Sequence, residues 1–168
     1  MVKRRGVTLM ELLLVVGIVS VLFTIAAPLM KQVNRQFIMV RSKMELQQEA
    51  RGIMYIITRS LRQAQSSSII VDRVANQPFY SKISFTTSQS SSTFVSNQMA
   101  FEQEGKTLFQ TIGGRRRPLT RNLYYLAFTF PRSDDMGIMS VSLTLQKGIY
   151  EGQTKTLHMA SEKVRIMN

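Results

Sequence analysis

The carboxylate of Glu11 is the side chain in this sequence that is most unusual for its surroundings. It lies near the start of the apolar stretch VTLMELLLVVGIVSVLFTIAAPLM, residues 7–30, and is the only ionisable side chain there. A charged side chain costs about 2.5–3.5 kcal/mol at the centre of a bilayer and less near its edge. A nearby cation in the correct position offsets that cost. The chemistry that Glu11 offers is therefore ion pairing inside or at the edge of a membrane.

Other groups that could do chemistry are few. His158 is the only histidine, and no acid or nucleophile stands at a useful spacing from it, so we expect it to be structural. The sequence has no cysteine, which excludes disulfides, thiol catalysis and zinc–thiolate sites. It also has no glycine-rich phosphate loop, metal-ligand cluster or nucleophile elbow. We therefore expect no enzymatic activity, no cofactor and no metal site.

The charge of the chain is strongly positive, with 22 Lys and Arg against 10 Asp and Glu and a formal net charge of +12. Such a balance is typical of proteins that bind nucleic acid or anionic lipid. The basic residues are scattered, however, and the one concentrated group is Arg115, Arg116 and Arg117 in GGRRRP, residues 113–118. This group offers contact with DNA phosphates or an acidic partner. Three charges in one loop are a weak electrostatic footprint, so we expect a solvated hairpin turn and rank nucleic acid as the less favoured partner.

The apolar stretch is long enough to cross a membrane, because about 20 apolar residues span a hydrocarbon core of roughly 30 Å. A secretory signal has a shorter apolar region of about 7–15 residues. The small residues of TIAAPLM, residues 24–30, leave cleavage after Ala27 open as an alternative. Lys3, Arg4 and Arg5 precede the span, so the positive-inside rule predicts a cytoplasmic N-terminus and an exported remainder.

The helical pattern continues beyond the membrane-length segment. Apolar residues recur at helical spacing at Val33, Phe37, Val40 and Met44, and again at Ala50, Met54, Ile57, Leu61 and Ala64. The first clear break is QSSS at residues 65–68. The sequence therefore predicts one nearly continuous helix over residues 7–65, whose last third needs a partner surface along one face.

Two residues are expected to weaken the first part of this helix. Pro28 removes one backbone hydrogen bond and crowds the carbonyl of Thr24, at about 3 kcal/mol in a regular helix. Gly17 costs about 1 kcal/mol relative to Ala. We expect the stretch between them to bend or partly unwind when it packs against other helices. Alternatively, Pro28 marks the outer edge of the membrane.

After residue 68 the hydrophobic period changes to two. MSVSLTLQ, residues 139–146, alternates apolar Met139, Val141, Leu143 and Leu145 with Ser and Thr, which is typical of a half-buried strand. The other predicted strands cover residues 69–74, 82–87, 98–102, 107–112, 124–130, 154–159 and 164–166. The fold class is therefore α+β, with a long N-terminal helix, first transmembrane and then amphipathic, packed on a C-terminal antiparallel β-sheet.

Residues 4–22, RRGVTLMELLLVVGIVSVL, resemble the N-terminus of type IV prepilins. That family comprises type IV pilus subunits, type II secretion pseudopilins and competence pilins. The shared features are basic residues, a glycine, Thr and Leu after one apolar residue, an acid five residues past the glycine, and an unbroken apolar helix. Val7 stands where the family usually has Phe, and Met10 where Leu or Ile is common, but both remain apolar.

The resemblance implies that a membrane-embedded prepilin peptidase cuts between Gly6 and Val7 and methylates the new amino group of Val7. Removal of the leader would lower the formal net charge to +9. In the family, the acid corresponding to Glu11 is thought to pair with the N-terminal amine of a neighbouring subunit as helices stack into a filament. Pairing within the same chain and reach toward the cytoplasmic headgroups are the alternatives for Glu11.

The remainder resembles the J-type minor pseudopilins and related minor pilins more loosely. The resemblance rests on residues 44–66 with the turn Leu61-Arg62-Gln63-Ala64, on LTRNLYYLAFTF (119–130) and on the closing VRIMN (164–168). Major pseudopilins carry an acidic calcium loop, whereas only the pair Asp134 and Asp135 is available here. Major pilins often close a loop with a disulfide, which this chain cannot form. Both absences favour a minor subunit in a priming or tip role.

The resulting expectation is a pilin-like fold with a leader (1–6), a transmembrane and assembly helix (7–30), its amphipathic continuation (31–65) and an extracytoplasmic sheet domain (66–168). The protein would be a single-pass inner-membrane protein that joins a type II secretion pseudopilus or a type IV pilus. Its partners would be the prepilin peptidase, other pilin or pseudopilin subunits and the inner membrane. The alternative is a competence-type subunit that binds DNA through residues 115–117.

Overall fold

The computed structural model describes residues 6–87, 98–132, 135–150 and 154–167, and the statements below concern these residues. The chain divides into two compact units, Met1–Arg41 and Ser42–Asn168. The first unit contains the N-terminal part of helix α1 (Leu9–Arg62). The second contains the C-terminal part of α1, a short 3-10 helix η1 (Ser66–Ser68) and all the strands.

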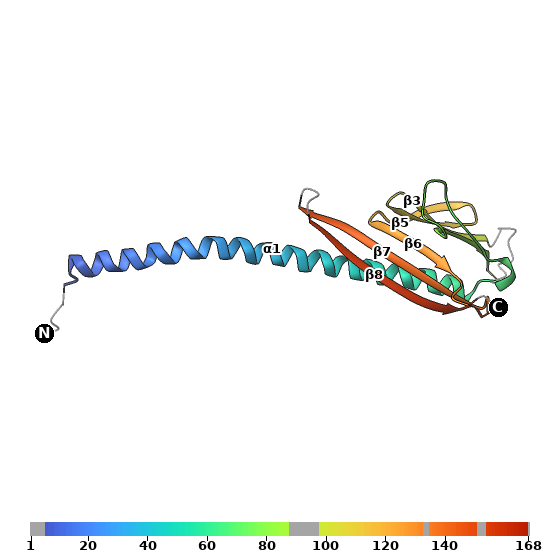
Figure 1. Cartoon of the computed structure of the whole chain (residues 1–168), viewed down its shortest axis with the longest axis horizontal. Helices are drawn as coiled ribbons and strands as arrows, with labels where there is room; N and C mark the ends of the chain where they lie inside the picture. The colour runs from blue at the N-terminus through green and yellow to red at the C-terminus, as the bar shows by residue number, and fades with distance from the viewer. Residues whose placement is uncertain (1–5, 88–97, 133–134, 151–153, 168) are drawn as a thin grey trace. The chain divides into compact units, whose positions relative to one another are not determined.

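Helix α1 runs without interruption through Gly17 and Pro28 (Figure 1). The bending expected at these residues concerns a helix packed against other helices, and it stays a prediction. The helix ends three residues before the predicted end. The residues that follow the helix bond to the sheet instead. Ala64 forms a β-bridge with Thr87, and the Gln65 N–H donates to the Thr86 carbonyl at 2.9 Å.

The strands form two antiparallel sheets. The five-stranded sheet has the order β1 (Ile70–Asp72), β2 (Lys82–Thr86), β3 (Gln98–Glu104), β4 (Thr107–Ile112) and β5 (Arg115–Thr120). The three-stranded sheet has the order β6 (Leu123–Thr129), β7 (Ile138–Tyr150) and β8 (Thr154–Arg165). The predicted α+β class, with one long N-terminal helix and antiparallel strands, is confirmed. The division into two sheets was not predicted.

Two local expectations need correction. Residues 115–117 were expected in a hairpin turn, but they open strand β5, which pairs with β4, and the turn lies at Gly113 and Gly114. Both glycines have positive φ, 53° and 80°, which a tight hairpin turn requires. Residues 154–159 and 164–166 were expected as separate strands, but β8 is one strand that pairs with β7 from end to end.

One hydrophobic core joins α1 to both sheets. The predicted inward residues of β7, Met139, Val141, Leu143 and Leu145, are all buried. From α1 the core receives Leu46, Ala50, Ile53, Met54, Ile57 and Leu61. The apolar stripe therefore holds in the last third of the helix, where Leu46 and Ile53 join it. The earlier stripe residues Val33, Phe37, Val40 and Met44 are exposed.

Two glutamates on the second unit's part of α1 bind the sheet. The Lys147 ammonium lies 2.7 Å from Glu45 Oε2, and the Asn122 side-chain amide donates to Glu49 Oε2 at 3.0 Å. Glu45 and Glu49 are one helical turn apart, so they project from the same side of α1. These two contacts fix the rotation of the helix on the three-stranded sheet beside the apolar core.

Candidate functional site

Helix α1 begins with a capping interaction between Thr8 and Glu11. The Thr8 carbonyl accepts the Leu12 N–H at 3.2 Å, which makes Thr8 the N-cap residue. Thr8 Oγ1 accepts the Glu11 N–H at 3.3 Å. Thr followed by Glu three positions later is the pattern of a capping box. The pattern T-x-x-E is visible in the sequence at residues 8–11, but its capping role was not predicted.

The Glu11 side chain is exposed at the positive end of the helix dipole. Within the described part of the chain, no cation lies within 4 Å of its carboxylate. The helix end itself stabilises an acid by about 0.3–1 kcal/mol at an exposed position. The exposed Glu11 carboxylate is therefore accessible to a cation from outside the described residues.

Gly6, Val7 and Thr8 precede α1 and adopt no regular secondary structure. All three are exposed, and apart from Gly6's two chain neighbours no described residue has an atom within 4 Å of the place where a side-chain Cβ on Gly6 would stand. The peptide bond between Gly6 and Val7 is therefore accessible in an irregular segment. Lys3, Arg4 and Arg5 lie outside the described residues.

Residues 9–30 of α1 carry apolar side chains on all sides of the helix, and Glu11 is their only ionisable residue. Its most apolar 18-residue window has a mean hydropathy of 2.7 and is not buried by any other part of the protein. The helix is long and apolar enough to cross a membrane. Large apolar side chains such as Leu14, Ile18, Val21 and Phe23 are all more than half exposed. Such a surface needs lipid or protein around it.

The polar side chains inside this apolar stretch are satisfied within the helix. Ser20 Oγ donates to the Val16 carbonyl at 2.8 Å, and Thr24 Oγ1 donates to the Ser20 carbonyl at 2.9 Å. Hydroxyls that bond the carbonyl one turn back remove the cost of an unsatisfied donor in hydrocarbon. Ser20 and Thr24 are therefore compatible with a membrane-spanning helix.

Arg115, Arg116 and Arg117 do not form a single cationic surface. Alternate residues of a strand point to opposite faces, so Arg116 points away from its two neighbours. The Arg116 guanidinium lies 2.9 Å from Glu102 Oε1, also pairs with Glu104, and stacks on the Phe109 ring at 3.8 Å. Arg117 Nε donates to Gln110 Oε1 at 2.8 Å. Two of the three guanidinium groups thus have partners inside the sheet.

The remaining candidate residues do not assemble into a reactive site in the described part of the chain. His158 is half-buried in β8, opposite Leu145 of β7. Asp135 Oδ1 accepts the Gly137 N–H at 2.8 Å, a local turn interaction, and Asp134 lies outside the described residues. Among the described residues, no group of three or more His, Asp and Glu could hold a metal ion.

Comparison of the chain with protein-family models, with curated proteins and with solved structures gives no match. The fold alone supports a coarser statement. A long apolar N-terminal helix, packed through its C-terminal part on antiparallel strands, is compatible with a pilin-like fold.

Proposed function

We propose that this protein is a minor pilin-like subunit that is anchored in the inner membrane and assembles into a filament through its N-terminal helix. The single observation that carries the proposal is the order of features at the start of α1. An accessible Gly6–Val7 bond precedes the cap residue Thr8. A helix follows that is apolar on all sides as far as residue 30 and carries Glu11 in its first turn.

In this proposal a prepilin peptidase cuts between Gly6 and Val7 and methylates the new amine of Val7. The irregular backbone at residues 6–8 supports this step, because a protease needs an extended segment and cannot bind a helix in its cleft. The cut would leave a charged amine four residues before Glu11. The Val7 amine of one helix could then pair with the Glu11 carboxylate of a neighbouring helix. This ion pair forms in only one axial register of the two helices.

The finer assignment follows the sequence resemblance. The subunit belongs to a type II secretion pseudopilus or a type IV pilus, in a priming or tip position, with other pilin or pseudopilin subunits as partners. Its N-terminus lies in the cytoplasm, and its sheets lie outside the cytoplasmic membrane. The protein acts in this account by assembly and not by catalysis.

Coexpression with a prepilin peptidase tests the proposal. The full chain is produced in membranes with an active peptidase and, separately, with a catalytically inactive one, and its N-terminus is identified by mass spectrometry. We expect a chain that begins at Val7 only with the active enzyme. A chain that keeps residues 1–6 in both membranes would contradict the proposal.

The DNA-binding alternative receives less support from the geometry. Its residues Arg116 and Arg117 bind Glu102, Glu104 and Gln110, so contact with phosphates would have to break those interactions. We therefore keep a single proposed function.

A further inference from the structure

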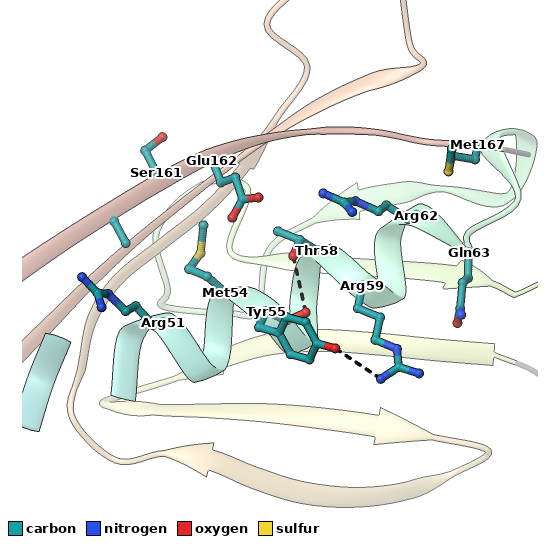
Figure 2. A pocket seen from close by; sticks show the side chains of 11 residues that line it. Arg51, Met54, Tyr55, Thr58, Arg59, Arg62, Gln63, Ser161, Glu162 and Met167 are labelled. Atoms are coloured by element: carbon teal, nitrogen blue, oxygen red, sulfur yellow. Dashed lines mark hydrogen bonds between the residues drawn. The ribbon is translucent and has the colours of Figure 1, made fainter. Parts of the chain in front are cut away.

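A groove of about 680 Å³ lies between α1 and strand β8 within the second unit (Figure 2). The helix contributes Arg51, Tyr55, Arg59 and Arg62, and the strand contributes residues 160–162. Neither the proposed cleavage site nor the apolar residues 9–30 of α1 line this groove. A ligand of this groove would therefore be independent of leader cleavage and of the apolar helix.

Strand β8 is at the edge of its sheet. It pairs with β7 on one side, and in the described part of the chain no strand pairs with its other side. Side chains of consecutive strand residues point to opposite faces. Ala160, Ser161 and Glu162 are consecutive and all line the groove, which means that the groove opens at the strand's edge. Backbone donors and acceptors of β8 are thus available to an added strand.

The groove carries an excess of positive charge. Arg51, Arg59 and Arg62 are exposed, and none of them has a carboxylate partner within 4 Å among the described residues. Among the described residues, the hydrogen-bond acceptor of Arg59 is the Tyr55 hydroxyl, at 3.5 Å (Figure 2). Of the described residues that line the groove, Glu162 is the single acid. An anionic occupant would complement this surface, and a cationic one would be repelled.

The groove also has an apolar component. Tyr55 is 62% exposed and Met167 is 77% exposed, and both line it. Tyr55 lies one helical turn from both Arg51 and Arg59, so the face of an added strand that meets these arginines also covers the Tyr55 ring. A nucleic acid strand offers phosphates but no donors and acceptors spaced to continue a β-sheet, so the edge of β8 favours a peptide.

We propose that this groove docks an extended acidic segment of a partner protein, which adds to the edge of β8 and places carboxylates on Arg51 and Arg59. These arginines are eight residues apart, about 12 Å along a helix. Carboxylates four residues apart on one face of a strand span about 13 Å. The inference concerns residues 51–63 and 160–167, and it does not depend on leader cleavage or on filament assembly.

Peptide binding to the full chain in detergent micelles tests the proposal. The probe is a fluorescent ten-residue peptide of alternating Glu and Thr, and its counterpart has Lys in place of Glu. We expect saturable binding of the acidic peptide and none of the basic one. The double variant Arg51→Glu/Arg59→Glu should weaken binding about tenfold or more, since each exposed charge contact contributes several-fold. The control Lys43→Glu/Lys106→Glu changes the net charge equally at exposed positions away from the groove and should bind as the parent does.

Strand addition is tested with the same peptide carrying N-methyl groups on alternate amides. In an added strand every second N–H bonds the host edge, so one methylated set should abolish binding and the other should preserve it. Equal effects of both sets would overturn the proposal. It would also be overturned by equal binding of the basic peptide, by equally strong binding of a single-stranded oligonucleotide at the same arginines, or by no binding at about 1 mM acidic peptide.

Discussion

Thr8 Oγ1 accepts the backbone N–H of Glu11 at 3.3 Å and so caps helix α1 at the residue that carries the only acid of the apolar stretch. Glu11 therefore has two separable properties. Its backbone position belongs to the helix cap, and its carboxylate remains exposed at the positive end of the helix dipole. Separate mutations can test the capping hydrogen bond and the charge of the Glu11 carboxylate.

Glu11→Gln should abolish filament entry without preventing leader cleavage. Gln keeps the size of the side chain and is also favoured at this position of a capping box, but it offers no charge to an amine. Thr8→Ala is the matched control, because it removes the cap at a cost of about 1 kcal/mol and keeps the carboxylate. The measurement is the fraction of processed chain in sheared filaments. Equal filament entry by Glu11→Gln and the parent would show that the charge is not used.

Gly6→Leu should block leader cleavage without disturbing the fold. Apart from the two chain neighbours, no atom of the described residues lies within 4 Å of the position that the new Cβ would occupy, so packing within that part of the chain does not require glycine there. Gly52→Ala is a control at an equally open position inside α1, and it should stabilise the helix by about 0.5–1 kcal/mol. N-terminal mass spectrometry reads the cleavage. If Gly6→Leu is processed at the parent's rate, the assignment of the cleavage site is wrong.

Phe101→Ala should destabilise the second unit by about 3–5 kcal/mol, because Phe101 is fully buried in the hydrophobic core, with its ring centroid 6.2 Å from that of Phe85. The exposed Phe37, in contrast, contacts no core, and Phe37→Ala should change the free energy of unfolding by less than about 0.5 kcal/mol. Denaturant unfolding of the detergent-solubilised chain measures both. Similar losses for the two variants would contradict the observed position of the core.

Asn122→Ala should lower the free energy of unfolding by about 1–2 kcal/mol, because it removes a hydrogen bond to a charged carboxylate in a partly buried setting. Lys147→Ala should cost less, about 0.2–1 kcal/mol, since its pair with Glu45 is exposed to solvent and screened by salt. The free energy of unfolding of each variant, measured at low and at high salt, distinguishes the two contributions. A loss for Lys147→Ala that is larger than that for Asn122→Ala, and independent of salt, would contradict this ranking.

Local periodicity was sufficient to predict the helix and most strands. The apolar residues that alternate from Met139 to Leu145 form one buried face of a strand. The apolar residues spaced three and four apart from Ala50 to Leu61 form one buried face of the helix. Strand β5 was missed because its three arginines hide any alternation. That segment is a strand because it pairs with β4 at an edge, where Pro118 is also tolerated.

Long-range relationships could not be read from the sequence. The ion pair of Glu45 with Lys147 joins residues 102 positions apart, and nothing local to either residue indicates the other. The continuity of β8 has the same origin, since its polar middle is held by pairing with β7 and not by its own hydrophobicity. The groove beside Arg51 and Arg59 likewise depends on how the strand edge lies against the helix.

The most direct test of the central claim is mass spectrometry of the chain in two fractions of cells that carry the secretion or pilus machinery and its peptidase. We expect the chain in sheared filaments to begin at Val7. The Glu11→Gln chain should begin at Val7 in membranes but be missing from filaments. If the unmutated chain keeps residues 1–6 in these cells, or is missing from filaments, then the protein is not a processed filament subunit.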